Sequence, residues 1–553
     1  MTEPRRLTPA LRDNAFRWIA DDCDDASRTE LQDVLARAMG GDADALADLA
    51  DRMSGTLAFG TAGLRGPVRA GPNGMNVAVV VRTTAGVASW LTAQGLAGGT
   101  VVLGRDARHG SAEFAAAAAE VLAAAGFAVR VLPGALPTPV LAFAVRHLGA
   151  VAGIQVTASH NPPADNGYKL YDSSGAQIVP PADQRIEAAI AAAPTARDVP
   201  RTPGPHPVAE GVTEAYLARV ATVPRGPGRK VRVAATALHG VGAETLRAAL
   251  AGAGFTDVHL VAEQAEPDPD FPTVSFPNPE EDGATDLLLA LAERAGADVA
   301  VALDPDADRC ALGVPGRDGV WRMLRGDETG VLLGEHVLST VDSTRQPDPL
   351  VATTIVSSSM LAAVAKAHEA RYTETLTGFK WLARAGTGLV FAYEEALGVC
   401  VDPEAVNDKD GISAAALACG LVAALGEDGR TLLDALDELA VRHGVHLTDQ
   451  VSLRFEDLSR IGALMSALRA SPPDSLDGTA LSTEDLLPDA DVLRLRGEGV
   501  RVIVRPSGTE PKLKAYLEIV EPVDGPDALE RARARAGERL AGLRRGVEGL
   551  LTG

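Results

Sequence analysis

Ser159 and His160 belong to a stretch, residues 157–171, whose residue types suit chemistry better than packing. A serine hydroxyl is a poor nucleophile unless a neighbouring base or metal lowers the cost of removing its proton. His160, or Lys169 further along the stretch, can supply part of that help. The stretch therefore predicts a nucleophile on a loop. A surface turn is the alternative, because short motifs match by chance.

Two predicted strands position this loop. The apolar run 150–156 predicts a short buried strand, and Pro162-Pro163 then interrupt regular hydrogen bonding. Asn166-Gly167 favours a tight turn with positive φ, so residues 168–171 return as a second strand. That return can bring the lysine near the serine.

Asp304, Asp306 and Asp308 alternate directly after the apolar run 299–303. Alternate residues of an extended chain project to one side, so three carboxylates can converge on one hard cation. The segment fits an EF-hand poorly, because the sixth position of that loop requires glycine and here is Arg309. A divalent metal site is predicted, with a plain surface acidic cluster as the alternative.

Two segments that contain glycine and an arginine are suited to binding phosphate. Residues 59–66 combine three glycines with Arg65, so backbone amides and a forked cation can approach an anion. Near the C-terminus, Arg505 precedes Ser507, Gly508 and Thr509, which form a phosphate nest between two predicted strands. An ordinary hairpin turn is the alternative for the second segment.

These segments occur in one chain in the order of the α-D-phosphohexomutases, the phosphoglucomutase and phosphomannomutase superfamily, which the sequence resembles over roughly residues 55–520. The resemblance implies that Ser159 carries a phosphoryl group, lends it to a sugar phosphate and takes it back. It implies catalytic roles for His160, Lys169 and Arg65, with either His160 or Lys169 as general acid and base. The 59–66 segment resembles the phosphopentomutase-like branch.

The same resemblance implies a Mg²⁺ site at Asp304, Asp306 and Asp308, with a phosphoryl oxygen on Ser159 as a further ligand and Arg309 beside it. A cation there would neutralise charge as the phosphoryl group moves.

The implied substrate contacts lie in the second half of the chain. Glu394 follows the apolar run 389–392 and can accept hydrogen bonds from two sugar hydroxyls, although a glutamate there is often only solvated. Many relatives carry serine two positions later, where this chain has Ala396. Gly378 and Lys380 lie in a loop similar to one that holds substrate. Arg505, Ser507, Gly508 and Thr509 are implied to grip the phosphate that is not transferred.

The predicted function is interconversion of hexose 1-phosphate and hexose 6-phosphate, of glucose or mannose, with a sugar bisphosphate as intermediate and activator. A phosphopentomutase acting on ribose or deoxyribose phosphates is the alternative within the class. Two alternatives lie outside the mutase class. One is a metal-dependent sugar phosphatase with Asp304 as nucleophile, and the other is a regulatory protein that binds sugar phosphates without turnover.

Strand, helix and strand recur from residues 101, 231 and 350, at intervals of about 120 to 130 residues. The repeat predicts an α/β fold of three similar mixed α/β domains and a C-terminal α+β domain around one central cleft. One large sheet is the alternative. The predicted parts are a helical extension at 1–50, with Ser27 or Thr29 as a helix cap, and domains I to IV at 51–205, 206–318, 319–440 and 441–553.

The composition of the chain indicates which kinds of binding partner to expect. The chain has 553 residues and a net charge of −22, which argues against nucleic acid because that partner requires a basic surface. No apolar run approaches the roughly 18 to 20 residues of a membrane span. Four scattered cysteines suit a reducing cytoplasm. The expected partners are small sugar phosphates, and the oligomeric state stays open.

Overall fold

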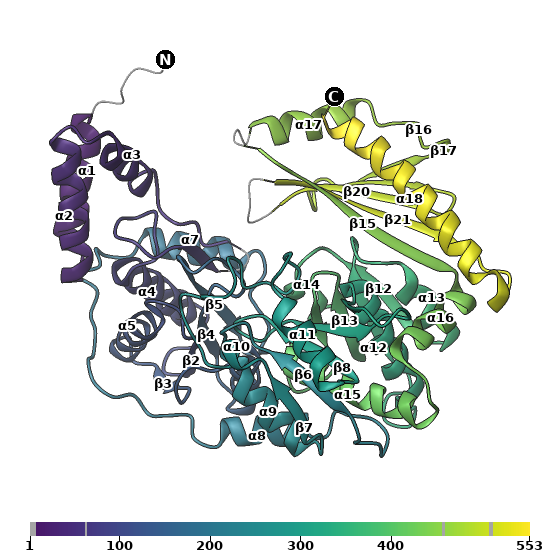
Figure 1. Cartoon of the computed structure of the whole chain (residues 1–553). Helices are drawn as coiled ribbons and strands as arrows, with labels where there is room; N and C mark the ends of the chain where they lie inside the picture. Colours follow the sequence, from purple (N-terminus) through teal and green to yellow (C-terminus); the bar gives the residue numbers. More distant parts are fainter. Residues whose placement is uncertain (1–6, 61–62, 456–458, 508–511, 553) are drawn as a thin grey trace. The chain divides into compact units, whose positions relative to one another are not determined.

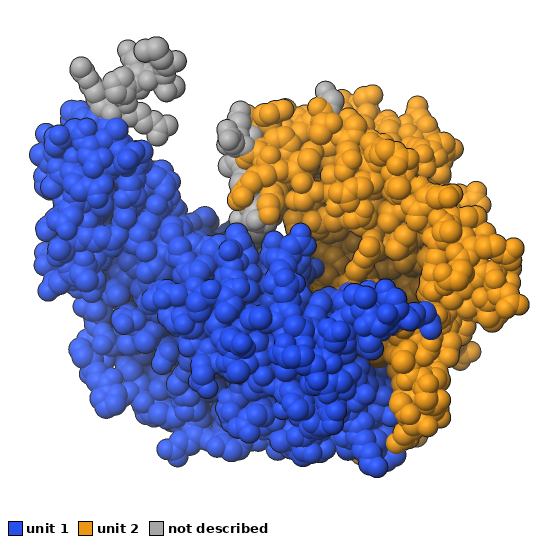
Figure 2. Space-filling view, in the orientation of Figure 1, with its two compact units in different colours: residues 1–323, 398–423 blue, residues 324–397, 424–553 orange. Residues whose placement is uncertain are grey.

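The computed structural model describes residues 7–60, 63–455, 459–507 and 512–552. These residues form two compact units, residues 1–323 with 398–423 and residues 324–397 with 424–553 (Figure 2). Residues 398–423, which our sequence boundaries assign to domain III, therefore cluster with the first unit.

The first unit begins with three helices, as the sequence predicts: α1 (Pro9–Asp21), α2 (Asp25–Met39) and α3 (Ala43–Arg52). They share a small core that includes Ala15, Leu31 and Leu49. The predicted cap of α2 is wrong. Asp24 is extended and accepts a hydrogen bond from Ser27 N at 2.8 Å, so the helix starts earlier and Ser27 falls within its first turn.

The first sheet has the strand order β1-β5-β4-β2-β3 (Figure 1). Its strands are β1 (Leu64–Pro67), β2 (Thr100–Arg105), β3 (Ala128–Val131), β4 (Ala152–Val156) and β5 (Asp165–Asp172). Its helices are α4 (Val77–Ala93), α5 (Ser111–Ala124), α6 (Thr138–His147) and α7 (Ala182–Ala191). β2 runs parallel to β3 and β4, while β5 returns antiparallel to β4.

The second sheet repeats this arrangement with the order β10-β9-β8-β6-β7. Its strands are β6 (Arg232–Thr236), β7 (Asp257–Leu260), β8 (Val299–Leu303), β9 (Cys310–Pro315) and β10 (Trp321–Met323). Its helices are α8 (Val212–Val220), α9 (Gly242–Gly252), α10 (Ala262–Ala265) and α11 (Asp286–Ala295). Again the first strand runs parallel to the next two, and the fourth returns antiparallel.

The second unit contains the third repeat. Its elements are α12 (Gly326–Thr340), β11 (Leu350–Thr354), α13 (Met360–Ala367), β12 (Arg371–Thr375), α14 (Phe379–Leu382) and β13 (Leu389–Glu394). β11 runs parallel to both β12 and β13. The three repeats lie in separate sheets, which excludes the single large sheet.

The C-terminal part is an α+β domain, as predicted, with the strand order β15-β21-β20-β19-β18. Its strands are β15 (Val445–Arg454), β18 (Ser482–Asp485), β19 (Leu493–Gly497), β20 (Val500–Pro506) and β21 (Lys512–Glu521), with a hairpin of β16 (Ser475–Leu476) and β17 (Thr479–Ala480). Its helices are α17 (Ser459–Ala470), η1 (Pro526–Ala528) and α18 (Leu529–Thr552). α18 packs on β15 and β21.

The remaining elements are β14 (Gly398–Cys400), α15 (Gly411–Glu427) and α16 (Leu432–His443). Among the described residues no single helix is long and apolar enough to cross a membrane. Only the pair α15 and α16 passes such a test, by length and composition alone and with a bend between the two helices.

The predicted turn at Asn166-Gly167 is wrong, because both residues lie inside β5 and pair with β1. The chain reverses earlier, through hydrogen bonds from Asn161 N to Ala158 O and from Asp165 N to Pro162 O. Gly167 serves a close approach instead. A Cβ there would lie 2.6 Å from Thr157 O and 2.7 Å from Leu64 O.

Candidate functional site

The third strand of each repeat ends at a residue that the sequence singled out. β4 leads to Ser159, β8 leads to Asp304, and β13 ends at Glu394. Parallel strands place such residues at the carboxyl edge of their sheet, where ligands of α/β proteins bind. In the first unit this arrangement brings Ser159 and Asp304 together, since Ser159 Oγ donates a hydrogen bond to Asp304 Oδ2 at 2.8 Å.

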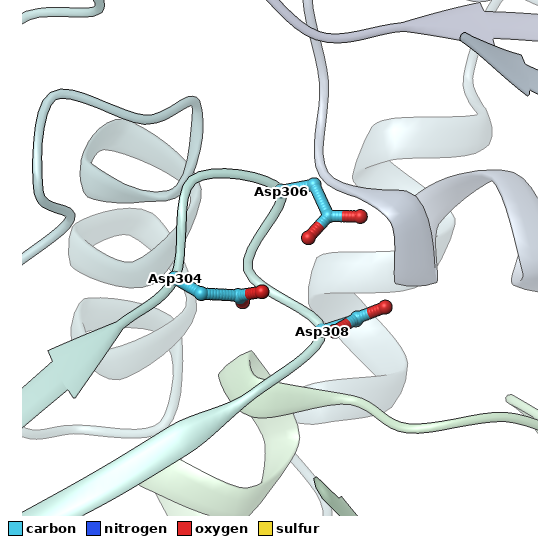
Figure 3. A group of neighbouring side chains, drawn as sticks. All are labelled: Asp304, Asp306 and Asp308. Atoms are coloured by element: carbon cyan, nitrogen blue, oxygen red, sulfur yellow. The ribbon is translucent and has the colours of Figure 1, made fainter. Parts of the chain in front are cut away.

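Asp304, Asp306 and Asp308 form the centre of the site (Figure 3). All three are fully buried, and one carboxylate oxygen from each lies within 4.8 Å of the others. The route to this convergence differs from the predicted extended chain. Ala307 adopts φ 55°, and its N–H donates to Asp304 O at 2.8 Å, so the carboxylates meet across a turn.

Two lysines balance the carboxylates. Lys169 Nζ donates to Asp306 Oδ2 at 2.7 Å and to Asp308 Oδ2 at 2.9 Å, and Lys409 Nζ lies 3.3 Å from Asp308 Oδ2. Burial opposes the charge of Lys169, but Asp306 and Asp308 outweigh it and raise the pKa of the lysine. Among the residues that the structure describes, no lysine forms an ion pair with Asp304, and burial together with Asp306 and Asp308 raises the pKa of Asp304 well above its usual range.

The three carboxylates fit a divalent cation. Asp306 Oδ1 and Asp308 Oδ1 are buried, and neither has a hydrogen-bond partner within the described ranges. A buried carboxylate oxygen without a donor is costly, and oxygen ligands suit hard cations such as Mg²⁺. Thr138, at the start of α6, holds Asp306 in place by donating its hydroxyl to Oδ2 at 2.6 Å and its N–H to the backbone oxygen at 2.9 Å.

Ser159 is 2% exposed and adopts φ 53°, a left-handed backbone conformation. Its N–H donates to Thr157 Oγ1 at 2.9 Å. Left-handed conformations of residues other than glycine are strained and concentrate at functional sites. The backbone thus holds the hydroxyl at the carboxylate cluster.

His160, rather than Lys169, contacts the serine hydroxyl. Its Nδ1 lies 3.2 Å from Ser159 Oγ. Burial, Arg309 and Arg65 lower the pKa of His160 well below its usual range, so the ring is neutral and able to accept a proton. The return strand carries Lys169 to the same carboxylate cluster, where its ammonium donates to Asp306 and Asp308, and its predicted help to the serine stays a prediction.

The two predicted arginines also lie in the first unit. Arg65 is in β1 opposite Gly167, and burial lowers the pKa of its guanidinium despite Asp306 and Asp308. Its Nη1 is 3.4 Å from Asn161 Oδ1. Arg309 donates its N–H to Asp304 Oδ1 at 3.0 Å.

The glycine-rich segment before Arg65 requires at least one of its glycines. A Cβ on Gly63 would lie 1.8 Å from Tyr168 O, and its φ is +78°. Thr61 and Ala62 lie outside the described residues.

In the second unit, Glu394 ends β13 and is 7% exposed. Gly378 has φ 109° and directly precedes α14, which carries Lys380 with its Nζ 5.1 Å from the centre of the Trp381 ring. Next to Glu394, Glu395 Oε2 accepts a hydrogen bond from Ser357 Oγ at 2.9 Å. The sugar-contact roles of Glu394, Gly378 and Lys380 stay predictions.

The predicted phosphate-binding residues of the C-terminal domain begin in β20. Arg505 is the penultimate residue of that strand, paired with Lys514, and Ser507 N donates to Lys512 O at 2.8 Å. The predicted residues Gly508 and Thr509 lie outside the described residues.

Sequence reasoning missed Thr138 and Lys409. Thr138 gave no signal beyond its place between two prolines at a helix start. Lys409 stands in the charged stretch Asp408-Lys409-Asp410, directly before the apolar helix α15. Three charged residues next to an apolar helix were the only signal in the sequence for a role of Lys409.

Four consecutive family domains match the chain. They are described as phosphoglucomutase/phosphomannomutase alpha/beta/alpha domain I over residues 56–197, domain II over 214–316, domain III over 325–441 and the C-terminal domain over 453–525.

Individual proteins agree with this match. The chain is 43% identical over 456 residues to a "Probable phosphomannomutase" of Haemophilus influenzae, covering 80% of this chain and 93% of that protein. It is 34% identical over 529 residues to a phosphopentomutase of Mus musculus, covering 85% of each. A crystal structure of a phosphoglucomutase/phosphomannomutase family protein from Burkholderia thailandensis shares the fold, with a TM-score of 0.67, 23% identity and coverage of 90% of this chain and 98% of that one.

Proposed function

The chain belongs to the phosphoglucomutase/phosphomannomutase family, and we propose that it interconverts hexose 1-phosphate and hexose 6-phosphate through phosphorylated Ser159. The observation that carries this proposal is the placement of a buried serine hydroxyl 2.8 Å from a buried three-carboxylate cluster. A serine in that position can exchange a phosphoryl group where its charge is balanced.

In the first half-reaction, the phosphoryl group leaves Ser159 Oγ as its bond to that oxygen breaks, and a new bond forms to the free hydroxyl oxygen of the sugar phosphate. The proton of that hydroxyl is accepted by the enzyme and passed to Ser159 Oγ, the leaving oxygen. We assign this role to His160, because its neutral Nδ1 lies 3.2 Å from Ser159 Oγ. In the second half-reaction, the bisphosphate has turned over, and its other phosphoryl group forms a bond to Ser159 Oγ as its bond to the sugar oxygen breaks. The proton of Ser159 Oγ passes through His160 to that sugar oxygen.

Lys169 has a supporting role in this proposal. Its ammonium is committed to Asp306 and Asp308, and its raised pKa keeps it charged. It therefore balances the cluster and orients two of its carboxylates. Arg65 and Arg309 would contact the phosphoryl group, since the charges of both act on the cluster.

Asp304, Asp306 and Asp308 would hold Mg²⁺, which when bound would neutralise charge that develops on the phosphoryl group. The Oδ1 atoms of Asp306 and Asp308, which have no hydrogen-bond partner among the described residues, support this assignment.

We further propose that the second unit recognises the substrate. Glu394 would accept hydrogen bonds from sugar hydroxyls, with Gly378 and Lys380 beside it. Arg505, Ser507, Gly508 and Thr509 would bind the phosphate that is not transferred. One set of contacts must serve two orientations of the bisphosphate, which suits a forked guanidinium that can bind either phosphate.

The hexose is favoured over a pentose by the identity to a probable phosphomannomutase. A phosphopentomutase activity is the second candidate, because the mouse relative carries that name and is similar over 85% of both chains. Free thiols at all four cysteines are compatible with the cytoplasmic location that we propose.

A phosphatase with Asp304 as nucleophile is the less suitable reading of the site. Both Asp304 oxygens accept hydrogen bonds, from Ser159 Oγ and Arg309 N, which occupies the lone pairs that a nucleophilic carboxylate would use.

Two measurements test the proposal. A coupled-enzyme panel over the 1-phosphates of glucose, mannose, glucosamine, ribose and deoxyribose should show turnover highest for glucose or mannose, and a pentose maximum would favour the second candidate. Peptide mass spectrometry of purified enzyme should find covalent phosphate on Ser159. Phosphate on an aspartate, with release of inorganic phosphate from the sugars, would replace the mutase by the phosphatase.

A further inference from the structure

Arg108 binds the backbone of the loop that carries Ser159. It lies in the turn between β2 and α5 and is 4% exposed. Its guanidinium donates to four carbonyl oxygens of the serine loop: Ser159 O at 2.6 Å, Asn161 O at 2.6 Å, Pro162 O at 2.8 Å and Asp165 O at 3.1 Å.

Arg108 adds donors to a loop that has few of its own: within the loop Asp165 N donates to Pro162 O at 3.1 Å, and Arg108 serves Ser159 O and Asn161 O as well. Pro162 and Pro163 have no N–H, and the loop lies between two strands whose ladder it interrupts. Two hydrogen bonds hold the left-handed backbone of Ser159. Its N–H donates to Thr157 Oγ1, and its carbonyl oxygen accepts from the guanidinium of Arg108. The position of the serine hydroxyl therefore depends on the position of one guanidinium.

That guanidinium is itself immobilised. Asp106 Oδ1 accepts hydrogen bonds from Arg108 N at 3.0 Å and from Ser111 Oγ at 2.6 Å, and Asp106 Oδ2 lies 3.4 Å from Arg108 Nε. The ring of Phe271, from the second repeat, lies with its centre 4.9 Å from Arg108 Cζ. Arg108 is thus fixed between two domains of the first unit.

We propose that Arg108 is a positioning residue for phosphoryl transfer: it holds the strained backbone of Ser159 so that Oγ stays at the carboxylate cluster. The proposal rests on the proposed function of Ser159. Arg108 acts through the serine and is assigned no contact with the substrate.

The chain offers a matched control in Arg229. Its guanidinium also donates to backbone carbonyls, of Ala253 at 2.7 Å, Gly226 at 2.8 Å and Gly228 at 2.6 Å, and it lies over the ring of Phe255 at 5.3 Å. A variant of Arg229 therefore loses the same kinds of contact in a segment that does not carry the serine.

The test compares Arg108→Lys, Arg108→Ala and Arg229→Lys in the full-length enzyme. Intact-protein mass spectrometry follows the rate at which glucose 1,6-bisphosphate phosphorylates Ser159, and steady-state assays separate kcat from KM. For Arg108→Lys we expect both the transfer rate and kcat to fall about 100-fold, because a displacement near 1 Å costs about that factor. KM should change less than about threefold, and Arg229→Lys should keep the wild-type transfer rate.

Added guanidinium should partly restore transfer in Arg108→Ala, which a general loss of stability would not allow. Wild-type transfer rates in Arg108→Lys would overturn the inference, as would equal losses in the Arg108 and Arg229 variants. If Arg108→Ala does not fold, the transfer rate and kcat of Arg108→Lys are sufficient to test the inference. Wild-type enzyme that never takes phosphate on Ser159 would instead overturn the proposed function.

Discussion

Replacing Asp306 by asparagine tests the metal site with little change of shape. Asp306 Oδ2 accepts hydrogen bonds from Lys169 Nζ at 2.7 Å and Thr138 Oγ1 at 2.6 Å, whereas Oδ1 is buried without a partner. The amide oxygen of an asparagine can take the place of Oδ2 and keep both bonds. Its NH₂ group then occupies the place of Oδ1 and removes that oxygen from the cluster.

The expected magnitude follows from this exchange. An amide nitrogen with two hydrogens cannot bind a cation, and one of three negative charges is lost. An interaction with a charged partner is worth about 1.5 to 3 kcal/mol, so the affinity for Mg²⁺ should fall by roughly 10- to 140-fold. The free energy of unfolding without metal should change by less than about 1 kcal/mol, because the two hydrogen bonds remain and repulsion between the carboxylates falls.

The assays are Mg²⁺ titration by calorimetry, turnover as a function of Mg²⁺, and urea unfolding in EDTA. Asp410→Asn is the matched control. Asp410 is also a buried aspartate of the first unit, but its Oδ1 accepts hydrogen bonds from Tyr216 Oη and the N–H of Ser413, and it is not one of the three grouped carboxylates. The Mg²⁺ affinity of the Asp410→Asn enzyme should match that of the wild type. An Asp306→Asn enzyme with wild-type Mg²⁺ dependence, or wild-type turnover after thorough chelation, would refute the assignment.

Two further predictions concern the second unit. Burial raises the pKa of Asp327 from 3.8 to about 6, so its contribution to stability is present below about pH 4 and is lost as the pH rises through 6. Asp327→Asn should therefore raise the free energy of unfolding at pH 8 by about 2 to 3 kcal/mol and leave it nearly unchanged at pH 4, and urea titrations that give equal shifts at both pH values would contradict this cause. Arg505→Lys keeps the charge but loses the fork, a loss of about 1.5 to 3 kcal/mol, so KM should rise about one to two orders of magnitude and activity should depend more on added sugar bisphosphate. Steady-state kinetics with and without bisphosphate that match the wild type would remove Arg505 from the site.

Local signals in the sequence were sufficient to predict the main strands and helices of the repeats. The strand, helix and strand that open each of the three repeats, and the strands that end before Ser159, Asp304 and Glu394, were expected from apolar runs. Failures came where a residue type serves two purposes. Asn166-Gly167 suits a turn, but Gly167 lies in a strand because Thr157 O and Leu64 O approach it too closely for a side chain.

The sequence by itself determined the chemistry of the site, because the reactive groups are grouped within short segments. Ser159 with His160, and Asp304 with Asp306 and Asp308, are close in the chain and would lie close together in almost any fold that exposes the ends of their strands.

Only the tertiary structure decided how these groups are partnered. Lys169 donates to Asp306 and Asp308, and Thr138 and Lys409 join the cluster from distant parts of the chain. Periodicity and turn preferences describe neighbours along the chain, whereas the partner of a buried charge is set by which strand ends the packed sheets bring together. The neutral state of His160 and the charged state of Lys169 follow from that packing, since burial and the nearest charges determine each pKa.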